Sequence, residues 1–250
     1  MYTLKKSLGQ HFLKDENICR RIIGTLREQP FSRLLEVGPG GGALTKYLIE
    51  IPGIEFRAVE LDAEKVDYLL ATYPALQGLL LNRDFLEMEK PFSGPFTLVG
   101  NFPYNISTQI LFRVLEWKED VECVIGMFQK EVAQRVAASE GSKVYGVTSV
   151  LVQSFYEVEY LFDVSENCFQ PPPKVKSGVI RLRPRKDLLA FKSEKDLFRL
   201  VKAAFGQRRK TLRNAVRDLF EATELQKELF NKRAEQLSVH QFAELTFSMK

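Results

Sequence analysis

The fold of this chain is decided by Arg33-Leu-Leu-Glu-Val37 and the turn that follows it, Gly38-Pro-Gly-Gly-Gly42. The first stretch is short and apolar, as in a buried strand, and helical character returns at Ala43. Glycines between a strand and a helix permit a sharp turn and let a ligand approach the backbone closely. The turn also satisfies the dinucleotide fingerprint loosely, as Gly38-x-Gly40-x-x-Ala43. The stretch therefore predicts an open α/β sheet that binds an adenosine-containing ligand.

Strands and helices alternate on both sides of this turn, which predicts parallel βαβ units in a sheet covered on both faces. The expected strands are 33–37, 54–60, 79–82, 96–100 and 121–128. The expected helices are 14–29, 43–50, 63–73, 107–117, 130–138 and 145–154, with Asp15 and Ser107 as N-caps of the first and fourth. Two longer strands, 155–164 and 175–183, are expected to close the sheet as an antiparallel hairpin.

The character of the sequence changes after Pro184. Residues 191–250 contain no proline and only one glycine, Gly206, and helical periodicity recurs there. Ser238 is expected to cap a last helix that carries Phe242 and Leu245. We therefore predict a Rossmann-like α/β domain over residues 1–186 and a small all-α domain over residues 187–250.

Composition indicates an ordinary globular protein. Of the 250 residues, 45% are hydrophobic and 27% are charged, and no apolar run is long enough for a membrane span. Three cysteines, Cys19, Cys123 and Cys168, are scattered without metal-ligand spacing. We expect no disulfide framework, no metal site, no secretory signal and a cytoplasmic, monomeric protein.

Basic residues are concentrated in two segments, although the net charge is only +4. Residues 171–186 and 202–217 each hold six basic residues and no acidic one. A local excess of one sign indicates a polyanionic partner such as nucleic acid. The alternative is two solvated faces of a mildly basic protein. In the second segment Arg209, Arg213 and Arg217 recur every fourth residue, so a helix would align them on one face.

Three carboxylates lie near the glycine turn, and of these Glu60 suits any adenosine-containing ligand. Glu60 ends the second strand, where a carboxylate can accept both ribose hydroxyls. Glu36 precedes the glycines and is expected to face the cationic end of a methionine moiety. Asp84 follows the third strand and is placed to bind an adenine amino group. Glu36, Asp84 and the presence of residues 6–13 before the first strand, with which NAD domains usually begin, favour S-adenosylmethionine over NAD. The alternative is a plain strand-to-helix turn with Glu60 as a surface carboxylate.

A second loop, Asn101-Phe-Pro-Tyr104, follows the fourth strand, where open α/β sheets bind ligands. The amine of adenine is a poor nucleophile, because its lone pair is delocalised into the ring. The Asn101 amide oxygen and the Phe102 carbonyl can each accept one N–H, and they bind the nitrogen better as it becomes cationic. Pro103 fixes the loop, and Tyr104 offers a face for an extruded base. The alternative is a proline turn with two packed aromatic rings.

The sequence resembles the ribosomal-RNA adenine dimethyltransferases over most of its length. The motifs that carry the resemblance are Lys6-Ser-Leu-Gly-Gln-His-Phe-Leu13, Leu35-Glu-Val-Gly-Pro-Gly-Gly-Gly-Ala-Leu-Thr45, Val59-Glu-Leu-Asp62, Gly100-Asn-Phe-Pro-Tyr-Asn-Ile-Ser107, Met127-Phe-Gln-Lys-Glu-Val-Ala-Gln-Arg135, Phe169-Gln-Pro-Pro-Pro-Lys-Val-Lys-Ser177 and Phe205-Gly-Gln-Arg-Arg-Lys-Thr-Leu-Arg-Asn214. Phe102 stands where the family usually has Leu, and Asn82-Arg-Asp84 replaces a more usual Gly-Asp pair.

The resemblance implies a methyltransferase that dimethylates two adjacent adenines near the 3′ end of small-subunit rRNA in an assembling ribosomal subunit. The cofactor set expected from the residues and the resemblance is Gln10, His11, Leu13, Glu36, Gly38, Gly40, Glu60, Leu61, Asp84, Phe85 and Asn101. The expected catalytic set is Asn101, Phe102, Pro103, Tyr104 and Phe169, with Tyr104 and Phe169 stacking on the adenine. The expected RNA-binding set is Lys174, Lys176, Arg208, Arg209, Lys210 and Arg213.

Several alternatives stay open at the level of sequence. Relatives that methylate large-subunit rRNA and confer antibiotic resistance share the loop of Asn101, although the segments 169–175 and 207–210 favour the small-subunit group. A ribosome-assembly factor whose methylation is incidental is a second alternative, and a dinucleotide-dependent oxidoreductase is a third. Phe169 is alternatively a core aromatic at a proline turn, and His11 a structural residue.

Overall fold

The computed structural model describes residues 11–250, and the chain divides into two compact units. The first comprises residues 1–133 and 159–184, and the second comprises residues 134–158 and 185–250. The sequence predicts a division after residue 186, and the chain does pass into the second unit after Pro184. Residues 134–158 differ from that expectation, because they belong to the same unit as the helices that follow Pro184. No helix within residues 11–250 is long and apolar enough to cross a membrane.

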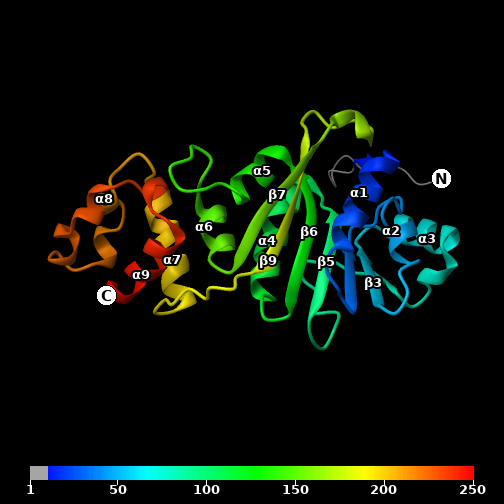
Figure 1. Cartoon of the computed structure of the whole chain (residues 1–250), viewed down its shortest axis with the longest axis horizontal. Helices are drawn as coiled ribbons and strands as arrows, with labels where there is room; N and C mark the ends of the chain where they lie inside the picture. Colours follow the sequence, from blue (N-terminus) through cyan, green and yellow to red (C-terminus); the bar gives the residue numbers. More distant parts are fainter. Residues whose placement is uncertain (1–10) are drawn as a thin grey trace. The chain divides into compact units, whose positions relative to one another are not determined.

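The first unit is built on a seven-stranded sheet of order β4-β3-β2-β5-β6-β9-β7 (Figure 1). Its strands are β2 (Arg33–Val37), β3 (Glu55–Glu60), β4 (Leu80–Asn82), β5 (Phe96–Asn101), β6 (Val121–Gln129), β7 (Tyr156–Val164) and β9 (Ser177–Pro184). The β2, β3, β4, β5 and β6 pairs are parallel, and β9 runs antiparallel to β6. The expected α/β sheet with an antiparallel end is confirmed.

The helices of the first unit connect the strands, as expected of βαβ units. They are α1 (Glu16–Leu26), α2 (Thr45–Leu48), α3 (Ala63–Thr72) and α4 (Ser107–Glu116), and α5 (Lys130–Val136) begins in this unit. Asp15 caps α1 by accepting hydrogen bonds from the amides of Asn17 and Ile18. Ser107 does not cap α4 as expected, because a 3-10 turn, Tyr104–Ile106, leads directly into the helix. The apolar faces of strands and helices meet in a core that includes Leu34, Ala58, Leu69 and Val99.

A second, two-stranded sheet lies outside the predicted pattern. Its strands, β1 (Phe12–Leu13) and β8 (Phe169–Gln170), pair antiparallel with Phe12 opposite Gln170 and Leu13 opposite Phe169. This pairing joins segments that are more than 150 residues apart in the sequence. It ties the segment before α1 to the β7–β9 connection.

The second unit is helical within residues 185–250, as predicted. Its helices are α6 (Val147–Gln153), α7 (Glu194–Gly206), α8 (Leu212–Ala215) and α9 (Val239–Leu245), and several 3-10 turns fill residues 217–236. Ser238 caps α9 by accepting a hydrogen bond from the amide of Gln241, as the sequence predicts. Phe205 of α7 stacks on Phe242 of α9 with their ring centroids 5.8 Å apart, which joins the two helices through the core.

Candidate active site

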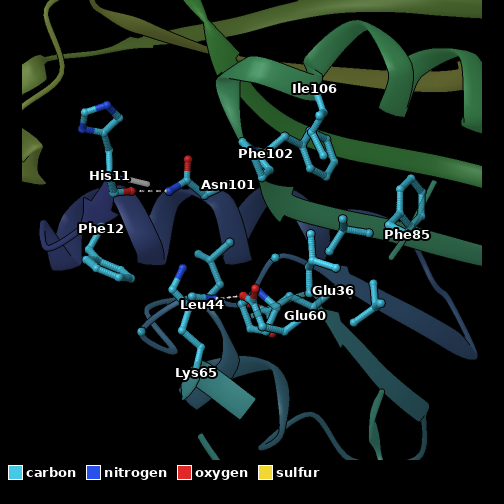
Figure 2. A pocket seen from close by; sticks show the side chains of 18 of the residues that line it. His11, Phe12, Glu36, Leu44, Glu60, Lys65, Phe85, Asn101, Phe102 and Ile106 are labelled. Atoms are coloured by element: carbon cyan, nitrogen blue, oxygen red, sulfur yellow. Dashed lines mark hydrogen bonds between the residues drawn. The ribbon is translucent and has the colours of Figure 1, made fainter. Parts of the chain in front are cut away.

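A pocket opens at the carboxyl ends of β2, β3 and β5 in the first unit (Figure 2). Ligands of open α/β sheets bind at this edge. The pocket brings together all the described members of the expected cofactor set: His11, Leu13, Glu36, Gly38, Gly40, Glu60, Leu61, Asp84, Phe85 and Asn101. Gln10, the remaining member, lies outside the described residues. Asn101, Phe102, Pro103 and Tyr104 of the expected catalytic set line the same pocket.

The floor of the pocket is the glycine turn after β2. Gly38, Gly40 and Gly42 have φ angles of +70°, +58° and +82°, which glycine adopts far more readily than other residues. A Cβ atom on Gly42 would lie 2.6 Å from the Tyr73 ring, so a side chain is excluded there by space as well. The turn therefore presents bare backbone to a ligand.

The Glu60 carboxylate connects the end of β3 to this turn. One oxygen accepts a hydrogen bond from the Gly40 amide at 3.2 Å, and the other accepts one from the Asp62 amide at 3.0 Å. The Asn82 side chain donates to the backbone carbonyls of Glu60 and Leu61 at 2.9 and 3.1 Å, which fixes this corner from β4. Glu60 is thus held in a fixed position, and its remaining lone pairs can accept hydrogen bonds from hydroxyl groups of a ligand.

Glu36 is a carboxyl group with almost no exposure, since only 1% of the residue is accessible. Its side chain accepts a hydrogen bond from the Thr45 hydroxyl at 2.8 Å. Burial, reinforced by the nearby Glu60 carboxylate, raises the pKa of Glu36 to about 8. A cationic ligand group beside Glu36 would favour its ionised form and offset the cost of that burial.

Asp84 and Phe85 both line the pocket. One Asp84 oxygen accepts a hydrogen bond from the Leu86 amide at 2.8 Å, in a turn that keeps the carboxylate fixed. Phe85 is buried and packs edge-on against Trp117, with ring centroids 5.3 Å apart. Leu61 lines the same pocket and is 53% exposed, which is unusual for a leucine and offers an apolar face to a flat ring.

Asn101 ends β5 and has a defined amide orientation. Its Nδ2 donates a hydrogen bond to the backbone carbonyl of His11 at 3.1 Å (Figure 2). A carbonyl can only accept, so the NH2 group must face His11. The Asn101 amide oxygen is therefore turned away from His11 and can accept a hydrogen bond from a ligand in the pocket.

The loop after Asn101 is anchored by the ring of Phe102, which is 1% exposed. The ring packs edge-on against Phe128 at 4.9 Å and lies over Gly100 and Gly126, which face each other on β5 and β6. A Cβ atom on Gly126 would lie 2.4 Å from the Phe102 ring, and one on Gly100 would lie 2.7 Å from it. The ring therefore needs both glycines beneath it.

Tyr104 is held at its hydroxyl end and along its ring. The hydroxyl forms a 2.5 Å hydrogen bond with the Ser177 hydroxyl of β9, and the His11 ring lies 5.5 Å from the Tyr104 ring. Burial raises the pKa of Tyr104, so its hydroxyl stays neutral. Ser107, which was expected to be a helix cap, instead donates to the carbonyls of Pro103 or Tyr104, each at 3.1 Å. The loop is thus fixed from both ends.

Comparison with known proteins agrees with this geometry. The model of the family described as "Ribosomal RNA adenine dimethylase" matches residues 1–249. The chain belongs to the ribosomal RNA adenine dimethylase family. It is 50% identical to the ribosomal RNA small subunit methyltransferase A of Flavobacterium johnsoniae over 246 residues, which cover 97% of this chain and 94% of that protein. Its identity to the protein of the same name from Parabacteroides distasonis is also 50%, covering 97% and 92%.

Two solved structures share the fold of this family member. A dimethyladenosine transferase from Plasmodium falciparum superposes with a TM-score of 0.77 at 23% identity and covers 94% of this chain and 96% of its own. The 23S rRNA methyltransferase ErmE superposes with a TM-score of 0.71 at 25% identity, covering 94% and 99%. The expected family and fold class are both confirmed by these findings.

Phe169 of this dimethylase-family chain does not lie where a stacking role requires. The residue is 1% exposed, belongs to the hydrophobic core and does not line the pocket. Its position opposite Leu13 in the β1–β8 pair explains why, because the ring packs on the core side of that small sheet. The structure thus corrects the expectation that Phe169 faces the substrate and favours the alternative of a core aromatic.

The expected row of arginines in the second unit is also wrong. Helix α8 covers only Leu212–Ala215, so Arg209 and Arg217 fall outside it. Arg208 donates to the backbone carbonyl of Lys143 at 2.6 Å, and Arg213 donates to that of Leu225 at 2.9 Å. These two side chains brace loops of their own unit. Among the described residues, the nearby carboxylates Glu221 and Glu224 pair with Lys250 and Lys227 and not with these arginines.

Four members of the expected RNA-binding set are exposed: Lys174, Lys176, Arg209 and Lys210. Lys174 and Lys176 lie in the first unit just before β9, and Arg209 and Lys210 follow α7 in the second unit. Within the described part of the chain, neither Arg209 nor Lys210 has an ion pair or hydrogen bond at its side chain. Their charges are available to a polyanion.

Lys65, which also lines the pocket, was not predicted from the sequence. It lies in the first turn of α3, where a lysine ordinarily faces solvent, yet the residue is only 4% exposed. The relevant signal was its distance of five residues from Glu60, which places both at the same end of the sheet. Among residues 11–250, no cluster of side chains is suited to hold a metal ion.

Proposed function

We propose that this chain transfers methyl groups from S-adenosylmethionine to the N6 amine of two adjacent adenines near the 3′ end of small-subunit rRNA. The observation that carries the proposal is the Asn101 amide, whose orientation is set by the His11 carbonyl at the edge of a glycine-floored pocket. The family and the named relatives at 50% identity support the same activity. The activity requires adjoining sites for the methyl donor and for the adenine amine that receives the methyl group.

The residues of the pocket fit the methyl donor. The bare turn at Gly38 and Gly40 leaves room for a ligand against the backbone, and Glu60 offers fixed acceptor positions for ribose hydroxyls. Asp84 and Phe85 suit an adenine ring, while buried Glu36 suits the ammonium end of a methionine moiety. Bound in this pocket, S-adenosylmethionine would supply an electrophilic methyl group on its sulfonium sulfur.

The loop of Asn101 supplies the acceptors for the amine. The Asn101 amide oxygen and the Phe102 carbonyl each accept one N–H of the adenine amine. Both acceptors gain strength as the nitrogen loses its planarity and becomes cationic, which stabilises the transition state more than the ground state. Tyr104 provides the stacking face for an adenine taken out of its RNA context. Phe169 is buried in the core and does not stack on the adenine.

The RNA is held by exposed cations outside the pocket. Lys174 and Lys176 of the first unit contact phosphates, and so do Arg209 and Lys210 of the second unit. Arg208 and Arg213 act on the RNA indirectly, by fixing the loops that present these cations. Phosphate contacts of this kind position an RNA without reading its sequence. The substrate is a folded rRNA in an assembling small subunit, and the enzyme acts as a monomer.

The decisive test is mass spectrometry of both rRNAs from a strain that lacks this protein. We expect dimethyladenosine to disappear from the 3′ region of the small-subunit rRNA and to return with the wild-type gene but not with an Asn101→Ala variant. Loss of a methylated adenine from the large-subunit rRNA would instead favour the function of ErmE, whose structure is similar. If Asn101→Ala restores ribosome assembly without methylation, the assembly role is independent of the chemistry.

A further inference from the structure

The ammonium group of Lys65 is buried inside the pocket, which is unexpected for a lysine. The residue is 4% exposed, and it comes from the first turn of α3, just after its N-cap Asp62. Removing an ammonium ion from water is costly unless nearby groups compensate for the lost hydration. Such a residue needs a role that a shorter or apolar side chain would not fulfil.

The structure places this ammonium over an aromatic ring of the N-terminal segment. The Lys65 Nζ lies 5.1 Å from the centroid of the Phe12 ring, within the range of a cation–π interaction. Figure 2 shows the two side chains on the same side of the pocket. Because the site is largely shielded from water, the attraction is stronger than at a surface.

The Phe12 ring in turn packs on the glycine turn. A Cβ atom at Gly40 would lie 3.2 Å from Phe12 Cε1, so the ring is in close contact with the backbone there. The same Gly40 donates its amide to Glu60. Phe12 therefore forms a wall of the pocket, and it directly follows His11, whose carbonyl orients Asn101.

We propose that Lys65 is a positioning residue for S-adenosylmethionine, which holds Phe12 against the glycine turn and so closes one wall of the cofactor pocket. This inference rests on the proposed cofactor. Lys65 acts through Phe12 and not by touching the reacting atoms. Removing its charge lets the segment His11–Leu13 leave the pocket more often, and a ligand must then restore the segment as it binds.

The test measures binding of S-adenosylhomocysteine by calorimetry to four variants. Lys65→Met keeps the length of the side chain and removes the charge, and we expect affinity to fall roughly five- to thirty-fold. Lys65→Arg keeps a cation over the ring and should stay within about threefold of the wild type. Phe12→Leu removes the ring, and the double variant Phe12→Leu/Lys65→Met should be no weaker than the weaker single variant.

Lys46→Met is the matched control. Lys46 also places its Nζ over an aromatic ring, 5.3 Å from the centroid of Tyr47, but neither residue lines the pocket. Its removal should leave cofactor affinity unchanged. In steady-state methylation, Lys65→Met should raise KM for S-adenosylmethionine and leave kcat within about twofold, since saturating cofactor restores the segment.

Several outcomes would overturn the proposal. The first is an unchanged cofactor affinity in Lys65→Met, and the second is an equal loss of affinity in Lys46→Met. The third is a fully additive loss of affinity in the double variant, which would mean that Lys65 contacts the cofactor itself. Thermal melting of each variant without ligand separates a folding defect from a loss of the wall. Binding of S-adenosylhomocysteine by the wild type is measured first, and its failure would count against the proposed cofactor and not against the role of Lys65 alone.

Discussion

The side chain of Asn101 donates a hydrogen bond to the backbone carbonyl of His11, at a distance of 3.1 Å. The two residues are 90 positions apart, and the bond connects the end of β5 to the segment before α1. A backbone carbonyl cannot be exchanged by substitution, so it imposes the same amide orientation whatever side chain stands at position 11. The segment before α1 thus sets the orientation of the amide that we propose as an acceptor for the adenine amine.

Replacing Asn101 by Ala should lower the single-turnover methylation rate by about 10²–10³, because a preorganised polar contact to the reacting group is lost. Affinity for RNA should change much less, since phosphate contacts lie elsewhere. Rapid-quench assays at saturating RNA and cofactor measure the rate, and filter binding measures affinity. A rate near that of the wild type would mean that another group orients the amine.

Glu60→Ala should weaken the binding of S-adenosylmethionine at least about tenfold, because hydrogen bonds from a ligand to a charged group are lost. The bond to the Gly40 amide is lost at the same time, which loosens the floor of the pocket. Glu64→Ala serves as control, because Glu64 is an exposed carboxylate of α3 outside the pocket. Calorimetry that found equal affinities for the wild type and Glu60→Ala would remove Glu60 from the cofactor site.

Glu36 should make the free protein less stable as the pH rises. Its pKa is about 8 in the folded state and near 4.5 when exposed, so between these values only the folded state holds the proton. Folding then takes up a proton, and stability falls by up to about 1.4 kcal/mol per pH unit across this window. Glu36→Gln, which keeps an acceptor for Thr45, should remove that slope.

Urea unfolding of both proteins at pH 5.5, 6.5 and 7.5 measures the effect of Glu36. The advantage of Glu36→Gln over the wild type should grow steadily from the lowest to the highest pH. Parallel curves at all three values would show that Glu36 is ionised in the free protein. Adding S-adenosylmethionine should reduce the wild-type slope, because its ammonium group favours ionised Glu36.

A methyl group at position 126 should disturb the catalytic loop from below. In Gly126→Ala the new Cβ would lie 2.4 Å from the Phe102 ring and 2.5 Å from the Phe128 ring. We expect a loss of about 1–3 kcal/mol in unfolding free energy from overpacking, together with slower methylation. Gly24→Ala is the control, since nothing lies within 4 Å of its Cβ position and alanine suits helix α1. A stable and fully active Gly126→Ala protein would contradict this account.

Arg209 and Lys210 should carry more of the RNA affinity than Arg208 and Arg213. The double variant Arg209→Gln/Lys210→Gln should weaken binding of cognate and unrelated structured RNAs alike. Each lost phosphate contact should also lower the slope of log affinity against log salt by roughly 0.7–0.9. Arg208→Gln and Arg213→Gln should instead lower the melting temperature, because they break hydrogen bonds to backbone carbonyls. An unchanged salt slope in the double variant would move the RNA surface elsewhere.

The strand–turn–helix pattern around Gly38 was enough to predict the sheet and most of the pocket. The strands there alternate with helices, and the edge at which parallel strands end follows from topology. Helix boundaries were less accurate: α2 covers only Thr45–Leu48, although residues 43–50 are helical in pattern. The turn at Gly42 and Ala43 takes up the start of that segment.

The parts that sequence reasoning missed depend on contacts between distant segments. Strands β1 and β8 have two residues each, too few to show a period, and their pairing buried Phe169 instead of exposing it. Lys65 resembles any lysine at the start of a surface helix until Phe12 is placed beside it. The row of Arg209, Arg213 and Arg217 requires a continuous helix, but neither glycine nor proline marks the turns that interrupt it.

Gly100 and Gly126, which face each other on neighbouring strands, support the loop of Asn101 from below. Because the Phe102 ring rests directly on the sheet between them, the height of the loop above the strands is set by residues that never meet a ligand. Selection or engineering at the mouth of the pocket can therefore alter which nucleotide enters without altering the distance at which its amine is presented. Substitutions of Gly100 or Gly126 beneath the Phe102 ring would instead change the distance at which the amine is presented, while the choice of substrate stayed the same.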